Sequence, residues 1–429
     1  MSHFGVLSYR GTGHLNAMSA LSRHLLLRGH RVTCFERPDL QSHVLSRGID
    51  FVPIGCIRQR REFSPLDSQS RSAPSLSDLR YRIRRIMEEI DMSLHEAPAA
   101  LSRSRIDALL IDEITLPGPT LAQMLQLPYF IISTSVPHNF GWEVPHSLAH
   151  CGNKLAGLPR LYKSLLQISN LQMRGPVRWH LNRKRRQLNL APVLNLPRDY
   201  PPLAHIATLP ACLDFPRASL PHNFHYTGPF LDESAGYPVP FPWDSLDGRR
   251  LIYVSLGTAR TVPQTTFRVI AEACSGLGHQ VVISLGGSHS PEFLSDLPGE
   301  PLIVKEAPQR EIIRLADVVI NHGGINTVFE TLSEGKPMVA IPIAHDQPAL
   351  AARLSWLQVA EVIPHNDLSA KRLRAAIVTV LNTPSYRHTA HELQTQILAA
   401  RGLDRAVTII EEALGSNIST AQTLSYAYE

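Results

Sequence analysis

The chain has 429 residues, which is enough for two domains that each bury a core of their own. Hydrophobic residues make up 44% of the sequence, the mean hydropathy is -0.06, and no apolar run reaches the ~20 residues that a membrane-spanning helix needs. The net charge of +5 is unevenly divided: residues 1–200 hold 26 Lys and Arg against 15 Asp and Glu, and the remainder holds 16 against 22. The composition therefore excludes an integral helical membrane protein and predicts a basic first half.

Five cysteines stand far apart, at positions 34, 56, 151, 212 and 274, and no two of them form a C-x-x-C pair. An odd, scattered set argues against a disulfide framework and a zinc site and is typical of a reducing compartment. The chain also opens directly with a strand pattern, without the charged and apolar regions of a signal peptide. We therefore expect a cytoplasmic protein.

The positive charge of the first half is concentrated in three clusters, Arg58–Arg61, Arg80–Arg85 and Arg174–Arg186. A nucleic-acid interface would interleave aromatic residues with these charges, and only Tyr81 and Trp179 are near, so we expect no nucleic-acid partner. Two interpretations stay open. The clusters are solvated helix faces, or, because Trp179, Leu181 and Leu188 lie among the charges, they make peripheral contact with an anionic membrane.

Strand and helix patterns alternate along nearly the whole chain, which predicts an α/β protein with doubly wound parallel sheets. In the first half the expected strands are Phe4–Ser8, Val32–Glu36, Phe51–Ile54, Ala108–Asp112 and Tyr129–Ser133. The expected helices are Leu15–Leu27, Leu40–Arg47, Leu79–Leu101 and Thr120–Gln126. Residues 64–78, rich in Ser and Pro, predict a loop, and residues 136–230 show no regular alternation.

His14 follows a glycine turn, Gly11 to Gly13, between the first strand and the first helix. Open α/β sheets bind ligands at the carboxyl ends of their strands, which is where this histidine stands. Asp112 ends another strand at the same edge, with Glu113 as a competitor, since alternation points one of the two away. A histidine oriented by a carboxylate is suited to remove a hydroxyl proton at neutral pH. The alternative is a helix N-terminal histidine bonded to the backbone.

A second series of strands begins after a Pro-rich stretch. The expected strands are Leu251–Ser255, Val281–Ser284, Leu302–Val304, Val318–Asn321, Val339–Ile341 and Val359–Val362. These patterns predict a first domain over residues 1–230, a linker over 231–248 and a second domain over 249–400. A terminal helix is expected over 401–415, from the apolar spacing of Leu403–Leu414, with residues 416–429 frayed.

The most informative stretch runs from Asn321 to Gln347. A short apolar strand leads into two glycines and a helix that Gly335 and Pro337 terminate. A helix N-terminus after a glycine turn is an anion site, because unpaired backbone N–H groups and the positive end of the helix dipole converge there. His322, Asn326 and Thr327 would add side-chain donors, and the turn therefore predicts a phosphate site.

This stretch resembles the donor-binding signature H-x-G-x-N-[ST]-x-x-E…G-x-P…P…D-Q of UDP-sugar glycosyltransferases with two Rossmann-like domains. The matching residues are His322, Gly324, Asn326, Thr327, Glu330, Gly335, Pro337, Pro342, Asp346 and Gln347. The sequence around Asp346 is most similar to that of bacterial zeaxanthin (carotenoid) glucosyltransferases, and next to that of macrolide glycosyltransferases. The resemblance implies a GT-B architecture, with two domains facing across a cleft and the terminal helix returning to the first domain.

The resemblance also implies how a nucleotide diphosphate would be held. Thr258, after the strand Leu251–Ser255, would bind the diphosphate together with His322, Gly324, Asn326 and Thr327. Such donors matter because negative charge collects on the diphosphate as the sugar leaves. No D-x-D pair occurs in the sequence, so no carboxylate site for a divalent cation is visible and no metal or other cofactor is expected.

The rest of the donor is assigned in the same way. Glu330 would accept hydrogen bonds from the ribose, and Gln309 belongs to an element under the uracil, although Glu306 stands where the plant enzymes have a stacking tryptophan. Asp346 and Gln347 would bind the sugar hydroxyls, with glucose as the first expectation. Asp346 is also placed to cap the helix that starts at Pro348.

The family's catalytic histidine corresponds to His14, and the resemblance favours Asp112 as its partner. By position, Phe63, Phe140 and Trp142 are candidates for an apolar acceptor pocket. The expected reaction is inverting, metal-independent transfer of glucose from UDP-glucose to a hydroxyl of a lipophilic acceptor, a carotenoid first and a macrolide or phenolic compound second. The rivals of another class are a UDP-sugar epimerase or hydrolase and a non-catalytic UDP-sugar-binding protein.

Overall fold

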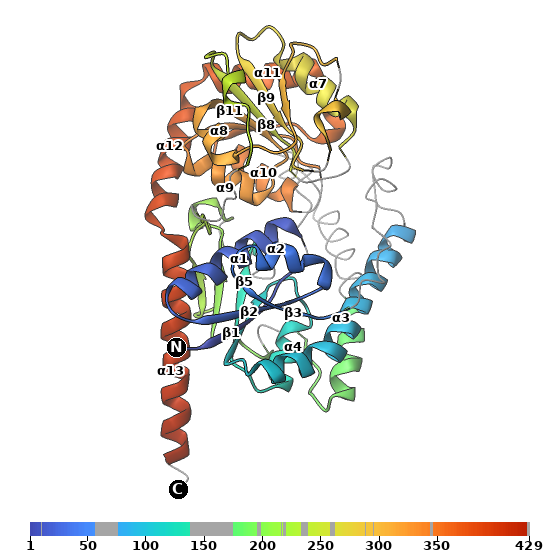
Figure 1. The fold of residues 1–429 in the computed structure, drawn as a ribbon, viewed down its shortest axis with the longest axis vertical. Coiled ribbons are helices and arrows are strands. Elements are labelled where there is room, and N and C mark those ends of the chain that lie inside the picture. Colours follow the sequence, from blue (N-terminus) through green and yellow to red (C-terminus); the bar gives the residue numbers. More distant parts are fainter. Residues whose placement is uncertain are drawn as a thin grey trace.

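A computed structural model describes most of the chain. The described residues are 1–9, 11–55, 76–137, 175–194, 199–215, 217, 220–232, 239–257, 262–287, 289–294, 296–343 and 346–426. They form two α/β bodies, one above the other in Figure 1, that are joined along one side by the last helices of the chain.

The first body is built on seven parallel strands in the order β3-β2-β1-β4-β5-β6-β7. The strands are β1 His3–Leu7, β2 Arg31–Glu36, β3 Asp50–Pro53, β4 Ala108–Asp112, β5 Tyr129–Ser133, β6 Ala204–Ala207 and β7 Phe224–Tyr226. The helices are α1 Thr12–Leu27, α2 Gln41–Leu45, α3 Leu76–Ser104, α4 Gly118–Met124 and one over residues 175–187. Because helices cover both faces of the sheet, its central strands β1, β4 and β5 are buried along their whole length and mostly apolar.

The two faces of this sheet have separate cores. Leu15, Leu21 and Leu25 of α1 pack on one face. On the other face Ile90 of α3 and Leu121 of α4 are buried, together with residues of the helix over 175–187. The strand–helix alternation thus produces a three-layer domain with its strand ends gathered at one edge.

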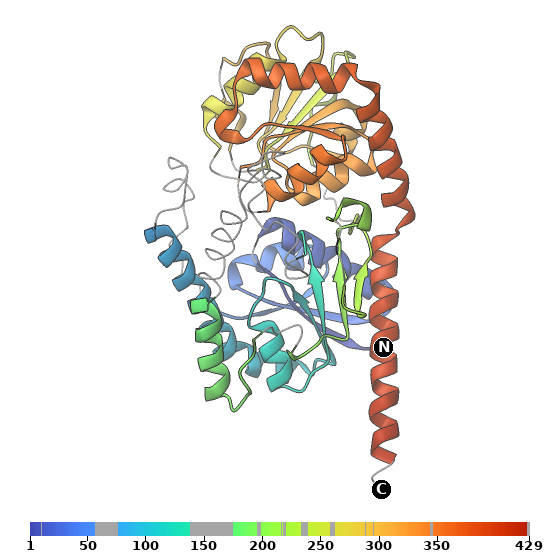
Figure 2. The ribbon, with the colours of Figure 1, turned by 180° about the vertical axis from the view of Figure 1, so that it is seen from behind.

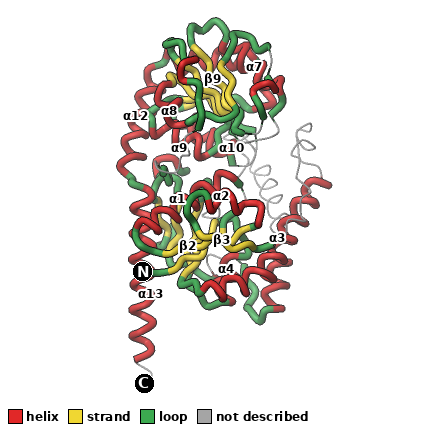
Figure 3. The backbone as a smooth tube through the Cα atoms, in the orientation of Figure 1, coloured by secondary structure: helices red, strands yellow, loops and turns green. Residues whose placement is uncertain are grey.

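The second body repeats this design with six parallel strands in the order β10-β9-β8-β11-β12-β13. The strands are β8 Leu251–Ser255, β9 Gln280–Ser284, β10 Leu302–Val304, β11 Ala316–Asn321, β12 Met338–Ala340 and β13 Ala360–Val362. The helices are α7 Gln264–Cys274, α8 Gln309–Leu315, α9 Ile325–Ser333, α10 Gln347–Trp356, α11 Ala370–Asn382 and α12 Pro384–Ala399. Figure 3 shows the yellow strands of each body enclosed by red helices.

The predicted α/β class with two parallel sheets is confirmed, and every predicted strand is present with bounds that differ by at most two residues. The stretch 136–230, which shows no regular alternation in the sequence, nevertheless contains β6, β7 and the helix over 175–187. These two strands have four and three residues, too short for a periodic pattern to emerge among prolines. The helix α3 begins at Leu76, inside the predicted loop 64–78.

The chain ends in α13, Gly402–Tyr426, which runs along the side of the first body and projects past it (Figures 1 and 2). Leu403, Val407 and Ile410 pack into the core beside α1, and Arg28 of α1 donates to Glu411 at 2.5 Å. The expectation that residues 416–429 are frayed is wrong up to Tyr426, since the helix continues that far. The limits of the domains stay a prediction.

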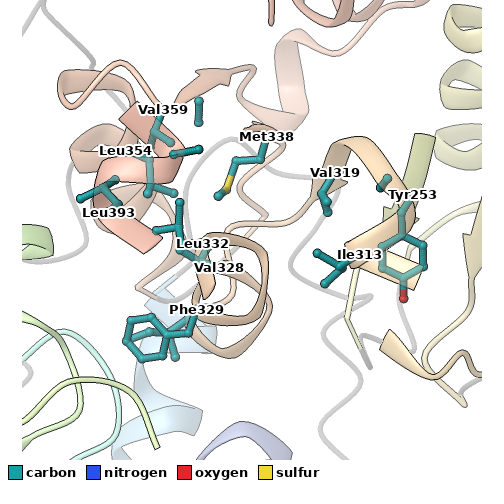
Figure 4. Close-up of a cluster of buried hydrophobic side chains, with 14 of the residues drawn as sticks. Tyr253, Ile313, Val319, Val328, Phe329, Leu332, Met338, Leu354, Val359 and Leu393 are labelled. Atoms are coloured by element: carbon teal, nitrogen blue, oxygen red, sulfur yellow. The ribbon is translucent and has the colours of Figure 1, made fainter. Parts of the chain in front are cut away.

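An apolar contact joins the two bodies. Val136, Leu209 and Leu213 of the first belong to the same buried cluster as Phe329 and Leu354 of the second. Figure 4 shows part of this cluster, in which side chains from α9, α10 and β12 converge. The second body is therefore seated on the segment that follows β6.

The basic cluster Arg174–Arg186 presents only part of the apolar surface that membrane contact would use. Leu181 is 4% exposed and belongs to the core, and Leu188 packs against the same core. Arg185 is buried and donates to Ala191, Thr120 and Gln123. Of the three apolar residues singled out there, Trp179 alone is largely exposed, at 61%. Among the described residues, no helix is long and apolar enough to cross a membrane.

Candidate functional site

Three side chains meet at the carboxyl edge of the first sheet. The Nδ1 atom of His14 lies 3.0 Å from Oδ2 of Asp112 and 2.6 Å from Oγ1 of Thr134. The Thr134 hydroxyl donates to the same Asp112 oxygen at 2.8 Å. With a carboxyl oxygen and a hydroxyl oxygen both facing Nδ1, that nitrogen carries the ring proton in the neutral imidazole and Nε2 carries the lone pair.

The sequence left Asp112 and Glu113 as competitors, and the geometry separates them. Asp112 is 1% exposed and turns toward His14. Glu113 turns the other way, where its Oε2 accepts from the Ser133 hydroxyl at 2.7 Å, and Ser133 Oγ lies 2.6 Å from Nε2 of His205. The alternation along the strand end therefore assigns the two acids to two different clusters.

Thr134 and Tyr9 were not predicted from the sequence. The Tyr9 ring stands edge-on to the His14 ring, with centroids 5.2 Å apart. Both residues lie just after a strand: Thr134 directly follows β5, and Tyr9 is the second residue after β1. The rule that identified His14 and Asp112, namely that ligands and their partners gather at strand ends, also points to these two positions.

A small pocket lies at this edge, between the sheet and α3. It is lined by Ser8, Phe35, Glu36, Ile54 and Met92 among others. Glu36 ends β2 and is 8% exposed, and burial raises the pKa of its carboxyl to about 8. A neutral carboxyl in a largely apolar pocket is a hydrogen-bond donor, and this lining was not predicted from the sequence.

The corresponding edge of the second sheet carries the glycine turn. Asn321 ends β11 fully buried, and its Oδ1 accepts from the Gly323 N–H at 2.7 Å. Gly323 has φ of 75°, which an L side chain adopts only under strain. Gly324 is then the N-cap of α9 without a side-chain capping bond. The first N–H groups of the helix are thus held at the turn by backbone geometry alone.

His322 is enclosed by two glycines. A side chain at Gly257 would come within 2.7 Å of the imidazole, and one at Gly324 would collide with it. Burial lowers the pKa of His322 to about 4, so the ring is neutral at pH 7. Its Nδ1 atom is buried and finds no hydrogen-bond partner among the described residues. An orphaned polar atom at this position is what a bound acceptor group would satisfy.

The two edges touch each other at Asn326. Its Nδ2 donates to the carbonyl of Gly13 at 3.1 Å, one residue before His14. Asn326 lies in the first turn of α9, so the start of that helix sits directly against the start of α1. This contact brings Asn326, one of the predicted donor residues, next to the predicted base, with one residue from each body.

Glu330 and Gln309 lie together behind the turn. The Gln309 amide donates to Glu330, and its oxygen accepts from the hydroxyls of Tyr253 and Ser255 at 3.2 and 3.1 Å. Burial raises the pKa of Glu330. Thr327 is 6% exposed in the first turn of α9. These residues were predicted to lie in one region, as they do. The hydrogen bond between Gln309 and Glu330 was not predicted.

Asp346 and Gln347 stand at the start of α10. Asp346 is the N-cap by position, yet its carboxylate makes no capping hydrogen bond. The Gln347 side-chain oxygen accepts from the Ile343 N–H at 2.9 Å. The Gln347 carbonyl also packs near Gly323, where a Cβ would lie 3.4 Å from it. Both side chains thus border the glycine turn.

Four of the predicted site residues, Phe63, Phe140, Trp142 and Thr258, lie outside the described residues. In the part of the chain that the structure describes, no group of three or more His, Cys, Asp or Glu side chains is arranged to hold a metal ion.

Comparisons with known proteins agree with this geometry. Residues 83–414 match the sequence pattern of the family described as UDP-glucoronosyl and UDP-glucosyl transferase. The zeaxanthin glucosyltransferase of Pseudescherichia vulneris is 29% identical, over 98% of this chain and 100% of its own length.

Solved structures agree as well. A calicheamicin glycosyltransferase has a TM-score of 0.76 at 21% identity, over 97% of this chain and 98% of that one. A spinosyn rhamnosyltransferase complexed with thymidine diphosphate has a TM-score of 0.68 at 21% identity, over 95% and 100%. The predicted GT-B fold is confirmed, and the chain belongs to the UDP-glucoronosyl and UDP-glucosyl transferase family of glycosyltransferases that use nucleotide-activated sugars.

Proposed function

We propose that this enzyme transfers glucose from UDP-glucose to a hydroxyl group of a lipophilic small molecule, with inversion at the sugar carbon and without a metal ion. The observation that carries the proposal is the contact between the two strand edges. Asn326, at the glycine turn, donates to the carbonyl next to His14, at 3.1 Å. A sugar held at that turn would present its C1 carbon to the histidine.

His14 is the general base in this proposal. Its Nδ1–H is fixed by Asp112 and Thr134, so the Nε2 lone pair takes the proton of the acceptor hydroxyl. The acceptor oxygen then forms a bond to C1 as the bond between C1 and the diphosphate oxygen breaks, and UDP leaves with the electron pair. A single displacement of this kind inverts C1, and the base contributes about 10²- to 10⁴-fold in rate.

The glycine turn stabilises the leaving diphosphate. Backbone N–H groups at the start of α9 and the side chains of Asn326 and Thr327 would donate to its oxygens. The neutral His322 ring has one N–H, and it would donate as well in the tautomer that carries this proton on the orphaned Nδ1. Thr258 and the backbone at Gly324 complete this set in the proposal. Because His322 is neutral at pH 7, it acts by hydrogen bonding rather than by charge.

The remaining donor contacts follow from the same placement. Glu330 would accept from the ribose hydroxyls while Gln309 holds it in place. Asp346, whose carboxylate makes no capping bond, and Gln347 would bind the sugar hydroxyls. A spinosyn rhamnosyltransferase of the same fold has been solved with thymidine diphosphate, so the ribose 2′-hydroxyl is the group that would distinguish a uridine donor from a thymidine donor.

We assign the acceptor side to the first body. A relative that aligns over the full length is a zeaxanthin glucosyltransferase, which supports a hydroxylated carotenoid first and a macrolide or phenolic compound second. The pocket beside Glu36 and the predicted residues Phe63, Phe140 and Trp142 would contribute to binding it. A cytoplasmic location with peripheral contact to an anionic membrane belongs to the same proposal. It rests on Trp179, which is exposed, and on Arg183, which lies 5.9 Å over the Trp179 ring.

One assay separates this proposal from its rivals. Release of UDP from UDP-glucose is measured with and without an acceptor, in the presence of a chelator, for the wild type and for His14→Ala. We expect acceptor-dependent release that the substitution abolishes. Acceptor-independent turnover would indicate a hydrolase or an epimerase, and binding without turnover would indicate a UDP-sugar-binding protein. A mass spectrum of the products from a carotenoid-producing host then identifies the acceptor.

A further inference from the structure

Arg353 is a buried cation between the two bodies. It belongs to α10, the helix that starts at Asp346 and Gln347. Its guanidinium group donates to the carbonyl of Cys212 in the first body at 3.2 Å. The side chain is 8% exposed, and the indole ring of Trp356 covers it with 4.1 Å between the guanidinium carbon and the ring centroid.

This arginine has no carboxylate of its own among the described residues. The nearest acid, Asp214, accepts from Arg217 at 2.6 Å and from the Tyr226 hydroxyl at 2.6 Å. The Nε atom of Arg353 is buried without a hydrogen-bond partner. Burial lowers the pKa of Arg353, and the charge of Asp214 opposes that effect.

A cation in this position is not needed for packing. Leu209 and Leu213 of the first body already meet Leu350 and Leu354 of α10 in one apolar cluster. Apolar side chains of similar size in such a contact are commonly neutral or stabilising relative to a buried charge. Arg353 instead restricts the relative orientation of the two bodies. Its planar guanidinium group is held by a carbonyl on one side and by an indole ring on the other, and this geometry allows few relative positions.

The contact continues to the catalytic pair. Asp214 is adjacent in sequence to the segment that holds Arg353, and Arg217, which it binds, also donates to the carbonyl of Pro137 at 3.2 Å. Pro137 lies three residues after Thr134, which bonds to His14 and Asp112. A series of contacts and short chain segments thus links α10, whose N-terminus is proposed to bind the sugar, to the end of β5, where Thr134 orients the proposed base.

We propose that Arg353 is a positioning residue that fixes α10 relative to the first body, and so sets the distance between the bound sugar and His14. This inference rests on the proposed function. It predicts an effect on turnover rather than on nucleotide binding, since every proposed contact to the nucleotide lies within the second body, away from Cys212. A misplacement of about 1 Å between reacting groups lowers a rate by about 10²-fold.

The test compares Arg353→Met and Arg353→Lys with a matched control, Arg374→Met. Arg374 also donates to two backbone carbonyls, those of Ala273 and Ser275 at 3.3 and 2.6 Å, but both lie within the second body. We expect Arg353→Met to reduce kcat by about 10- to 100-fold with UDP affinity and thermal unfolding close to those of the control. Arg353→Lys, which keeps one donor, should recover part of the loss.

A second readout does not depend on turnover. Small-angle X-ray scattering of the UDP-bound protein should show a broader distribution of distances for Arg353→Met than for the wild type or Arg374→Met. Loss of UDP affinity together with kcat would overturn the inference, because Arg353 would then support the donor site itself. Unchanged kcat with unchanged scattering would overturn it as well. If the wild type transfers no glucose, the proposed function fails and the scattering result alone decides the role of Arg353.

Discussion

The two strand edges that form the site are built in opposite ways. In the second body, the residues that border the glycine turn come mostly from one stretch, Asn321 to Gln347, which folds as strand, turn, helix, strand and helix. In the first body, His14, Asp112 and Thr134 come from three distant segments and meet because three strands end at one edge. The comparison teaches that the candidate nucleotide site is encoded locally, whereas the proposed base and its orienting groups depend on the whole sheet.

The largest effect is expected in the first body, where the site residues are far apart in the sequence. His14→Ala should lower the rate of acceptor-dependent UDP release by about 10²- to 10⁴-fold, because the proton acceptor is removed. Affinity for UDP, measured by calorimetry, should stay within about twofold. His24→Ala is the control, since His24 lies on the same helix and pairs with Asp404 at 3.3 Å, away from the site. Equal losses in the two variants would mean that the substitution acts through the stability of α1.

The next largest effect is expected in the second body, where the site residues come from one stretch of the sequence. His322→Gln should reduce kcat by about 10²-fold, since one preorganised donor to the departing diphosphate is lost. Steady-state kinetics with UDP-glucose and any accepted hydroxyl compound gives the value. His365→Gln provides the comparison, because His365 belongs to the same body and its pKa is also lowered by burial. A rise in KM alone, with kcat unchanged, would contradict the assignment of His322 to the leaving group.

The pH dependence of stability sharpens the comparison. Burial lowers the pKa of His322 to about 4 from an unfolded value of about 6.5. As the pH falls, His322 is protonated in the unfolded chain before it is protonated in the folded protein. The free energy of unfolding therefore has its full value, with respect to His322, above pH 6.5 and decreases as the pH falls from 6.5 to 4. The loss amounts to about 3 kcal/mol. Urea unfolding at several pH values should show that His322→Gln has a shallower acid dependence than the wild type.

The smallest effect concerns the ribose. Glu330→Gln should weaken UDP binding by about 10-fold, because a hydrogen bond to a charged acceptor contributes about 1.5 kcal/mol. The sharper measurement compares UDP with 2′-deoxy-UDP. The wild type should prefer UDP, and the variant should lose most of that preference. An unchanged preference in Glu330→Gln would place the ribose elsewhere.

Much of the fold could be predicted, and the reason is physical. Buried parallel strands such as Ala108–Asp112 are apolar up to their last residue, so they stand out against the amphipathic helices between them. The strand β7, with three residues, is below the length at which any pattern is visible. The helix α13 was predicted only to the end of its apolar spacing, because beyond Leu414 nothing in the sequence marks a face that is to be buried.

The site was predicted unevenly for the same reason. The turn around His322 is contiguous, so spacing along the chain carries its geometry. Thr134 lies far in sequence from Asp112 and joins it only through the pairing of β4 with β5. The expected capping role of Asp346 did not appear: its backbone has helical angles, φ -84° and ψ -10°, and not the extended conformation typical of a capping residue. Register between strands, and not composition, decides such contacts.

The position of α13 has a consequence for biosynthesis. The first body is synthesised before the second, yet Leu403, Val407 and Ile410, which complete one of its two cores, follow the second body in the chain. Until they emerge, the outer face of α1 and the strands beneath it remain uncovered, and a nascent chain in that condition is prone to aggregate or to recruit chaperones. A premature stop codon before residue 402 would therefore destabilise the first body, although that body is encoded at the opposite end of the gene.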